Sequence, residues 1–333
     1  MNTSKTNTWK NSLEERRKLT FQVKKEIFSK IPPFPREITL DINNRCNHKC
    51  YFCANPKIEH YDSLDKDLAF DLIKQGKDNG CKDLALQATG EPFMDKRLHE
   101  FVKEGKRVGY DYVYINTNGA LASSKKAKPV IDAGCDSIKF SINANNREDF
   151  KAVHGYDDFN KVLDNLKWIF DYRNKNKINM GIYVSSVRSS RSKVDNENID
   201  KYIKPYCDNF DFRDVSNQGG SMMELNKTES IKEGNILGSL KQKEFTTRCV
   251  YPFNRIVIDP YGYVVACTAD FHKKLQIGDA RKKTLKEIWS SEEFQYLREK
   301  HLKDKYDGIF CNKCLNNINC STNTLSESFL KKI

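Results

Sequence analysis

Three cysteines, Cys46, Cys50 and Cys53, lie close together in the stretch "CNHKCYFC". A structural zinc site or a complete iron–sulfur cluster normally takes four cysteine or histidine ligands. Three thiolates therefore either take a fourth ligand, such as His48, or leave one metal position open for a small molecule. The first arrangement would be a zinc knuckle, and the second would be a catalytic metal centre.

A second group of cysteines lies near the C-terminus, and it includes the pair "CNKC". The members of this group are Cys249, Cys267, Cys311, Cys314 and Cys320. On spacing alone the C-x2-C pair is compatible with a structural zinc ribbon. The other three cysteines, Cys81, Cys135 and Cys207, have no partner spacing, and we expect them to be small buried apolar residues.

Composition limits the class of protein. The N-terminus has no apolar signal-peptide core and no apolar run approaches membrane-spanning length, so we expect a cytoplasmic protein that does not contact a membrane. In the cytosol 11 cysteines favour metal binding over disulfides. The net charge of +12 allows a small anionic substrate. No basic tract is interleaved with aromatic residues, so we expect no nucleic-acid partner.

From residue 37 onward, strand patterns alternate with helix patterns. We expect strands at 37–42, 82–88, 111–116, 136–142, 178–185 and 208–213, with helices at 64–78, 96–108, 124–133, 158–174 and 195–204. Successive β–α units predict an α/β fold, a partial (β/α)6 TIM-like barrel whose ligands bind at the C-terminal ends of the strands. The first cysteine group directly follows the first of these strands.

The two ends of the chain follow other patterns. Apolar residues at helical spacing predict an N-terminal helix within 13–30, which "IPPFP" ends. After about residue 220 the alternation stops, and 253–270 is typical of two short strands joined by a turn. A helical stretch at 284–302 and the last cysteines follow. We therefore expect an N-terminal helix in 1–36, a core in 37–235 and a small metal-built domain in 236–333.

The spacing C-x3-C-x2-C, with Phe52 before the last cysteine, resembles the signature loop of the radical S-adenosylmethionine (radical SAM) enzymes. Further motifs stand at the predicted strand ends: "TGEP" at 89–92, "NTNG" at 116–119 and "SIN" at 141–143. The resemblance covers about residues 37–215. It implies a 4Fe–4S cluster on Cys46, Cys50 and Cys53, with S-adenosylmethionine chelated at the open iron.

The same resemblance implies which residues bind the cofactor. Glu91 would accept the methionine ammonium, and Arg188 or Arg191 would pair with its carboxylate. The other residues expected to bind the cofactor are Phe52, Gly90, Asn118, Ser141 and Asn143. One electron from the reduced cluster would cleave S-adenosylmethionine to a 5′-deoxyadenosyl radical that abstracts hydrogen from the substrate. A flavodoxin- or ferredoxin-type protein would donate that electron.

The C-terminal cysteines resemble the SPASM motif, in the shortened form called twitch. The cysteines that complete a second cluster in SPASM proteins are missing, since Thr324 stands where one of them would be. The resemblance implies one auxiliary 4Fe–4S cluster. The best four ligands are Cys249, Cys267, Cys311 and Cys314, with Cys320 spare or replacing one of them.

For the reaction, the favoured interpretation is hydrogen abstraction from a small molecule, such as a sugar, an aminocyclitol or a nucleotide-linked sugar. The outcome would be dehydrogenation, epimerisation or elimination. The alternative is a maturase that modifies a peptide or protein side chain, and a cluster-bearing regulatory protein has less support. Only 36 residues precede the predicted core, fewer than a leader-binding domain needs. Candidate substrate contacts and catalytic residues are Gln87, Tyr183, Arg188, Arg213 and Asp214.

Overall fold

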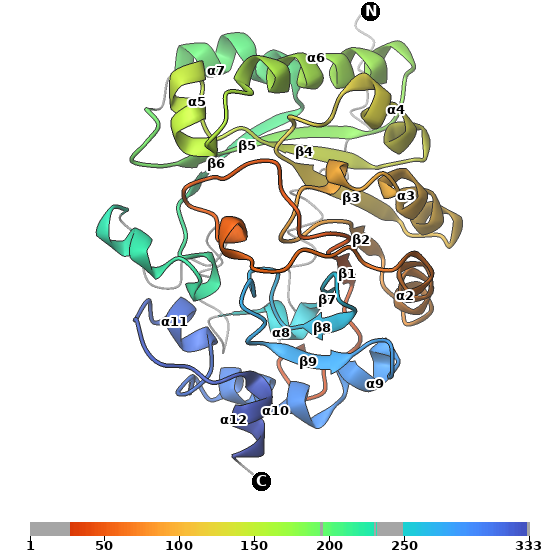
Figure 1. The fold of residues 1–333 in the computed structure, drawn as a ribbon. Coiled ribbons are helices and arrows are strands. Elements are labelled where there is room, and N and C mark those ends of the chain that lie inside the picture. Colours follow the sequence, from red (N-terminus) through yellow and green to blue (C-terminus); the bar gives the residue numbers. More distant parts are fainter. Residues whose placement is uncertain (1–26, 194–195, 230, 232–248, 332–333) are drawn as a thin grey trace, which may run out of the picture.

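The computed structural model describes residues 27–193, 196–229, 231 and 249–331. Within these residues the strands form one nine-stranded sheet in the order β6-β5-β4-β3-β2-β1-β7-β8-β9. Strands β1 to β6 run parallel, β7 pairs parallel with β1, and β8 and β9 are antiparallel. The sheet curves into an arc that does not close, with the helices α2, α3, α4 and α6 outside it (Figure 1). The predicted partial barrel is confirmed.

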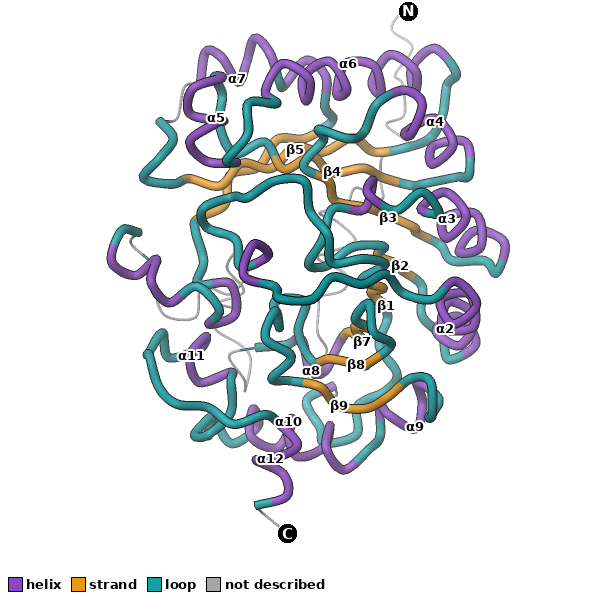
Figure 2. Tube along the Cα trace, in the orientation of Figure 1, coloured by secondary structure: helices purple, strands orange, loops and turns teal. Residues whose placement is uncertain are grey.

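The core alternates strands and helices along the chain (Figure 2). Its strands are β1 (Glu37–Leu40), β2 (Asp83–Ala85), β3 (Tyr112–Thr117), β4 (Ser137–Ser141), β5 (Gly181–Arg188) and β6 (Asn209–Asp214). Its helices are α2 (Lys66–Asp78), α3 (Leu98–Arg107), α4 (Ser124–Asp132), α5 (Arg147–His154), α6 (Phe159–Lys175) and α7 (Asn196–Tyr202). Short 3-10 turns occur at η2 (Asn55–Lys57), η3 (Pro92–Met94), η4 (Lys204–Tyr206), η5 (Gln218–Gly220) and η6 (Met223–Lys227).

The C-terminal part continues the same sheet. It contains the strands β7 (Arg255–Ile258), β8 (Tyr263–Val265) and β9 (Gln276–Asp279). Its helices are α8 (Tyr251–Asn254), α9 (Leu285–Trp289), α10 (Glu292–Leu302), α11 (Cys311–Leu315) and α12 (Leu325–Leu330). Because Glu37 to Leu40 pair residue by residue with Arg255 to Ile258, this part is joined to the core through a shared strand pair.

The two faces of the sheet differ in chemistry because side chains alternate along each strand. The face toward the helices is apolar. It carries Ile38, Leu40, Leu84, Val113, Ile115, Ile138, Phe140, Ile182 and Val184, all in the main core cluster. The concave face carries polar and aromatic residues instead, among them Glu37, Thr39, Tyr112, Tyr114, Ser137, Lys139 and Tyr183. The barrel interior is therefore a polar surface shielded from bulk water.

All six core strands are present close to where the sequence predicts them, but three elements differ from expectation. The second strand is short, because after Ala85 the chain turns toward the cysteine loop. Helix α5 was not predicted, since "REDFKAVH" is only eight residues long. Most of the predicted N-terminal helix and the expected boundary at 235/236 lie outside the described residues. The predicted helical stretch at 284–302 is two helices, because Ser291 caps a new helix by accepting from Phe294 N.

A buried arginine holds the C-terminal part together. Arg298, on α10, has no exposed surface, and its guanidinium donates to the carbonyl oxygens of Lys30 (3.0 Å), Pro252 (2.8 Å) and Trp289 (2.6 Å). Burial lowers the pKa of Arg298 to about 9. These bonds connect the segment next to Cys249 with the chain that enters β1.

We predict that Arg298→Met destabilises the protein by about 3 kcal/mol or more, because two buried carbonyl oxygens and one partly buried carbonyl oxygen lose this donor, and an unsatisfied buried acceptor costs roughly 1–3 kcal/mol. Urea unfolding followed by tryptophan fluorescence measures the change, and Trp289 reports on the site directly. Arg107→Met is the control, since Arg107 is exposed and its ion-pair partner among the described residues is Glu104 on the same helix. Equal urea concentrations at the unfolding midpoint for the two variants would contradict the structural role of Arg298.

Candidate active site and auxiliary cysteine centre

The cysteine loop follows β1 and lies across the middle of the sheet's arc, drawn in orange in Figure 1. Asparagine side chains hold it in place. Asn55 Nδ2 donates to the carbonyl oxygens of Asn44 and Thr89, both at 2.8 Å, and Asn43 Nδ2 donates to Glu91 O at 3.2 Å. The loop is thereby fixed to the turn that follows β2.

Cys46, Cys50 and Cys53 are electrostatic neighbours in this loop. Burial raises the pKa of Cys46 to about 12, and the Glu91 carboxylate is the second cause. Burial also raises the pKa of Cys50 well above its usual value, and Cys53 and Cys46 add to the shift. Three partly buried thiols this close are costly to ionise together, so a cation that neutralises thiolates fits the site.

Gly90 and Glu91 pack against the backbone of the cysteine loop. A methyl group at Gly90 would lie 2.3 Å from Asn43 O and 2.7 Å from Arg45 O, so only glycine allows this approach of the two loops. Glu91 is 2% exposed. Its Oε1 accepts from Thr117 Oγ1 (2.7 Å) and Phe93 N (3.1 Å), and its Oε2 accepts from Asn118 N (2.8 Å). Burial nevertheless raises the pKa of Glu91.

The other residues expected to bind the cofactor surround the same loop. Asn118 Nδ2 donates to Asn47 Oδ1 at 2.9 Å and faces Cys46 Sγ at 3.8 Å. Phe52 packs edge-on against Tyr51, with ring centroids 5.4 Å apart. Asn143 uses its Oδ1 to accept from Val187 N (2.9 Å). Ser141 ends β4, on the strand position that pairs with Ser185.

The candidate catalytic residues are spread over a wider area. Arg188 and Asp214 are paired positions at the ends of β5 and β6, exposed and 3.8 Å apart. Arg213 is mostly buried, 3.7 Å from Asp211. The hydroxyl of Tyr183 lies against Gly181, where a methyl group would be 2.3 Å away. The Tyr183 ring therefore leans toward the start of β5, whereas the cysteine loop lies at the other end of the strands.

The C-terminal cysteines converge on a small cavity. Cys249, Cys267, Cys311 and Cys314 all line it, together with apolar residues and His301. Burial raises the pKa of Cys311 well above its usual value, and Cys249, Cys267 and Cys314 add to that shift in this order. Cys320 is not among the lining residues; it lies 3.8 Å from Asn312 Nδ2.

His301 supports a cluster in this cavity. It is fully buried, and neither ring nitrogen has a hydrogen-bond partner among the described residues. A buried imidazole without partners is costly, and a group that fills the cavity would remove that cost. Four thiols around one cavity match the ligand set of one 4Fe–4S cluster.

The remaining cysteines behave as packing residues. Cys81 and Cys135 are buried, and Cys207 is partly buried against the core. Their thiols face main-chain carbonyl oxygens, at 3.1 Å for Cys81 and Pro35. Cys81 and Cys135 are thus buried as expected, whereas Cys207 is only partly buried.

A curved parallel sheet with a three-cysteine loop after its first strand, and a second cysteine cavity, defines an iron–sulfur barrel enzyme. The family model of the radical SAM superfamily matches residues 40–184, and that of an iron–sulfur cluster-binding (SPASM) domain matches residues 249–315. The chain is a radical SAM enzyme with a C-terminal SPASM-type domain. These domains imply a 4Fe–4S cluster, S-adenosylmethionine and auxiliary iron–sulfur chemistry.

Relatives and solved structures agree with this class. A probable GTP 3',8-cyclase of Saccharolobus islandicus (strain M.14.25 / Kamchatka #1) is 25% identical over 266 residues, which are 74% of this chain and 82% of the relative. BtrN in complex with AdoMet and 2-DOIA has a TM-score of 0.54 at 19% identity, covering 87% of this chain and 95% of BtrN. Streptococcus suis SuiB bound to precursor peptide SuiA has a TM-score of 0.62 at 16% identity, and the match covers 90% of this chain and 73% of SuiB.

No helix among the described residues combines the length and apolar character that crossing a bilayer requires.

Sequence reasoning missed two side chains at the site. His154, on the unpredicted helix α5, reaches Cys50 Sγ at 3.4 Å. Asn116 is the first residue of "NTNG", and its Oδ1 is buried without a hydrogen-bond partner in the described chain. Alternation along β3 could have identified Asn116, since it lies two residues after Tyr114 on the concave face.

We predict that replacing Cys46, Cys50 and Cys53 together with Ala abolishes reductive formation of 5′-deoxyadenosine from S-adenosylmethionine. Iron should fall from about eight to about four per chain, since each 4Fe–4S cluster contributes four. Anaerobic reconstitution, iron assay and chromatography provide the readouts. The cavity adds a matched pair: Cys314→Ala should lose the auxiliary iron, whereas Cys320→Ala should keep it. Undiminished 5′-deoxyadenosine in the triple variant would exclude this loop as the cluster site.

We predict that Glu91→Gln weakens binding of S-adenosylmethionine roughly tenfold to a hundredfold, because a charge-assisted hydrogen bond contributes about 1.5–3 kcal/mol. Equilibrium binding under anaerobic conditions measures it, with iron content as a check. Thr117→Val is the control, since it removes one hydrogen bond to Glu91 and keeps the carboxylate charge. If both variants bind equally, Glu91 holds the loops together and does not contact the ligand.

Proposed function

We propose that this enzyme abstracts hydrogen from a small polar molecule that binds on the concave face of the sheet. A sugar, an aminocyclitol or a nucleotide-linked sugar fits this description. When bound, the cluster and S-adenosylmethionine supply a 5′-deoxyadenosyl radical able to remove hydrogen from carbon. The chain's own residues bind and orient the substrate and exclude water from it.

The observation that carries the proposal is a pair of unpartnered acceptors beside the cysteine loop. Gln87 Oε1 and Asn116 Oδ1 are buried and have no hydrogen-bond partner in the part of the chain that the structure describes. Ala85 is the last residue of β2 and pairs with Tyr114; Gln87 follows two residues later, and Asn116 lies near the end of β3. Buried acceptors of this kind are costly unless a ligand donates to them. Hydroxyl and amino groups are such donors.

Charge on the concave face adds to this argument. Lys139 is 5% exposed there, and Arg255 pairs with Glu37 at 2.8 Å. Arg213 and Arg188 stand at the rim, and both remain predictions as contacts to an anionic substrate. The Saccharolobus relative is named for GTP, and BtrN was crystallised in complex with 2-DOIA. The name of the sequence relative supports a small-molecule substrate, whereas the likenesses to BtrN and to peptide-bound SuiB support the fold alone.

The test is transfer of deuterium into 5′-deoxyadenosine. The reconstituted enzyme is incubated anaerobically with S-adenosylmethionine, dithionite and one class of substrate deuterated at carbon: nucleotide sugars, aminocyclitols, GTP or peptides. Mass spectrometry of 5′-deoxyadenosine identifies the class that donates hydrogen. Transfer from a sugar or aminocyclitol supports the proposal, whereas transfer from peptides alone would establish a maturase instead.

A substitution at Gln87 separates a substrate contact from a packing role. We predict that Gln87→Met leaves the thermal midpoint unchanged or raises it, because a buried oxygen without a partner is removed. Substrate-dependent formation of 5′-deoxyadenosine should fall about tenfold or more, since a donor on the substrate loses its acceptor.

The same substitution at a second glutamine is the control for this prediction. Gln75 on α2 is far from the concave face, and its Oε1 accepts from Leu285 N at 2.8 Å. Gln75→Met should therefore lower the thermal midpoint and leave turnover unchanged. A lower midpoint together with normal turnover in Gln87→Met would contradict the substrate contact.

A further inference from the structure

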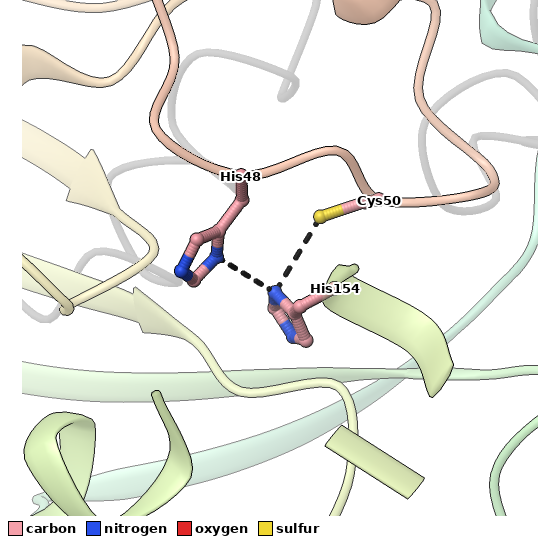
Figure 3. A group of neighbouring side chains, drawn as sticks. All are labelled: His48, Cys50 and His154. Atoms are coloured by element: carbon pink, nitrogen blue, oxygen red, sulfur yellow. Dashed lines mark hydrogen bonds between the residues drawn. The ribbon is translucent and has the colours of Figure 1, made fainter. Parts of the chain in front are cut away.

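Two histidines lie beside Cys50 (Figure 3). His48 and Cys50 come from the cysteine loop, and His154 comes from the end of α5. His154 Nδ1 is 3.4 Å from Cys50 Sγ and 3.2 Å from His48 Nδ1. Both imidazoles are buried.

The end of α5 is docked on the cysteine loop, and this fixes the position of His154. Lys49 N donates to His154 O (3.0 Å) and Tyr51 N donates to Val153 O (3.1 Å), so the helix's last carbonyl oxygens are satisfied by the loop. Gly155 ends the helix with φ +77°, and a methyl group there would lie 3.0 Å from Lys49 O. The His154 ring stacks on Phe150, with centroids 4.0 Å apart.

The hydrogen bonds of Asn143 determine which nitrogen of His154 carries the proton. Asn143 Oδ1 accepts from Val187 N, so its Nδ2 is the donor that faces His154 Nε2 at 3.4 Å. The main-chain N–H of Asn143 also donates to His154 Nε2, at 3.3 Å. Two donors face Nε2, so Nε2 is the acceptor and the proton lies on Nδ1.

His48 has the complementary arrangement. Its Nε2 lies 3.1 Å from the carboxylate of Asp158, so its proton is on Nε2 and its Nδ1 is an acceptor. The Nδ1–H of His154 therefore has two acceptors, His48 Nδ1 and Cys50 Sγ. Asn143 thus places the proton of His154 on the nitrogen that faces the sulfur, while Asp158 makes His48 Nδ1 a second acceptor that competes with Cys50 Sγ for it.

We propose that His154 donates an N–H···S hydrogen bond to the Cys50 ligand of the radical SAM cluster and thereby raises the cluster's reduction potential. This inference rests on the assignment of Cys46, Cys50 and Cys53 to that cluster. Reduction adds one electron, from the external donor, to the cluster, and no proton is transferred. The bond stabilises the reduced form more than the oxidised form because the sulfur becomes more negative. His154 is a positioning residue and does not contact the substrate.

The same three groups, His48, Cys50 and His154, are close enough to hold a metal ion, with ligand atoms within 4.8 Å of one another. A metal ion on His154 Nδ1 would require the ring proton on Nε2. Nε2 already faces the two N–H donors of Asn143. The geometry therefore favours a hydrogen bond to sulfur over a zinc ion held by the two histidines.

The test compares two substitutions at position 154 in the full reconstituted enzyme. His154→Phe keeps the stacking on Phe150 and removes the donor, whereas His154→Asn retains an N–H near the position of Nδ1. The midpoint reduction potential of the radical SAM cluster is measured by redox titration monitored by EPR. The signal of this cluster is identified by its change when S-adenosylmethionine is added. For His154→Phe we expect the ratio of reduced to oxidised cluster at a fixed potential to fall about tenfold. For a one-electron couple this corresponds to a midpoint potential that is ~59 mV lower. His154→Asn should stay close to the wild type.

A substitution of His48, whose Nδ1 competes with Cys50 Sγ for the proton of His154, should shift the midpoint potential of the cluster in the opposite direction. His48→Phe leaves Cys50 Sγ as the acceptor for His154 Nδ1–H, so the midpoint should rise. Pulsed EPR of the wild-type enzyme labelled with ¹⁵N-histidine should show a nitrogen coupling that His154→Phe abolishes.

Several results would overturn the inference. One is an unchanged midpoint in His154→Phe at full iron content, and another is loss of iron from both substitutions of His154. Stoichiometric zinc that disappears in His154→Phe would also overturn it. A wild-type enzyme with no EPR signal sensitive to S-adenosylmethionine would contradict the proposed function itself, and this inference with it.

Discussion

The cysteine loop depends on hydrogen bonds from side chains, because between β1 and η2 it has no regular secondary structure to satisfy its backbone. Asn43, Asn44 and Asn55 supply many of these bonds, and each connects the loop to a segment distant in the sequence. Asn44 reaches the carbonyl oxygen of His60, and Asp62 N donates to Asn44 Oδ1 at 2.7 Å. The amides hold three thiols in place without adding charge beside them. Charged side chains in these places would change the electrostatics of the cluster.

Burial of the thiols has a consequence for assembly. Burial raises the pKa of Cys46 and Cys267 to about 12 and that of Cys249 to about 11, so in the folded chain without metal these groups carry protons at neutral pH. Ligation requires thiolates, so formation of each cluster releases protons and must supply enough binding free energy to offset ionisation in a buried site. The sites are thus formed for thiolates bound to iron and not for free thiolates.

Sequence patterns predicted the parts of the fold that depend on local periodicity. The six parallel strands, the helices between them and the cysteine spacing all follow from residues near one another in the chain. Helix α5 was missed because eight residues give a weak pattern, and its stability comes from docking on the cysteine loop. The pairing of β7 with β1 was missed for a similar reason, since it joins residues more than two hundred positions apart.

Side-chain directions at the site were harder to predict than positions along the chain. Tyr183 was named as a polar residue at a predicted strand end; its ring lies on the concave face and leans toward Gly181, and its contact with substrate stays a prediction. The cavity separates Cys320 from the other four C-terminal cysteines, which spacing alone left open. The tautomer of His154 follows from Asn143 and Val187, residues on two further elements. The direction of a side chain, the grouping of the cysteines and the tautomer of a histidine all depend on contacts that form only when the chain is folded.

The shared sheet also determines how the two cysteine centres are related. Cys46 follows β1, Cys267 follows β8, and Cys249 precedes α8 and β7. The sheet order places β7 between β1 and β8, and the Arg255–Glu37 ion pair at 2.8 Å lies across the β1–β7 pair. Arg298 adds hydrogen bonds between the chain before β1 and Pro252, three residues after Cys249. The segment that leads into the cysteine loop and the segment that follows Cys249 are therefore connected by backbone pairing, by an ion pair and by the hydrogen bonds of Arg298.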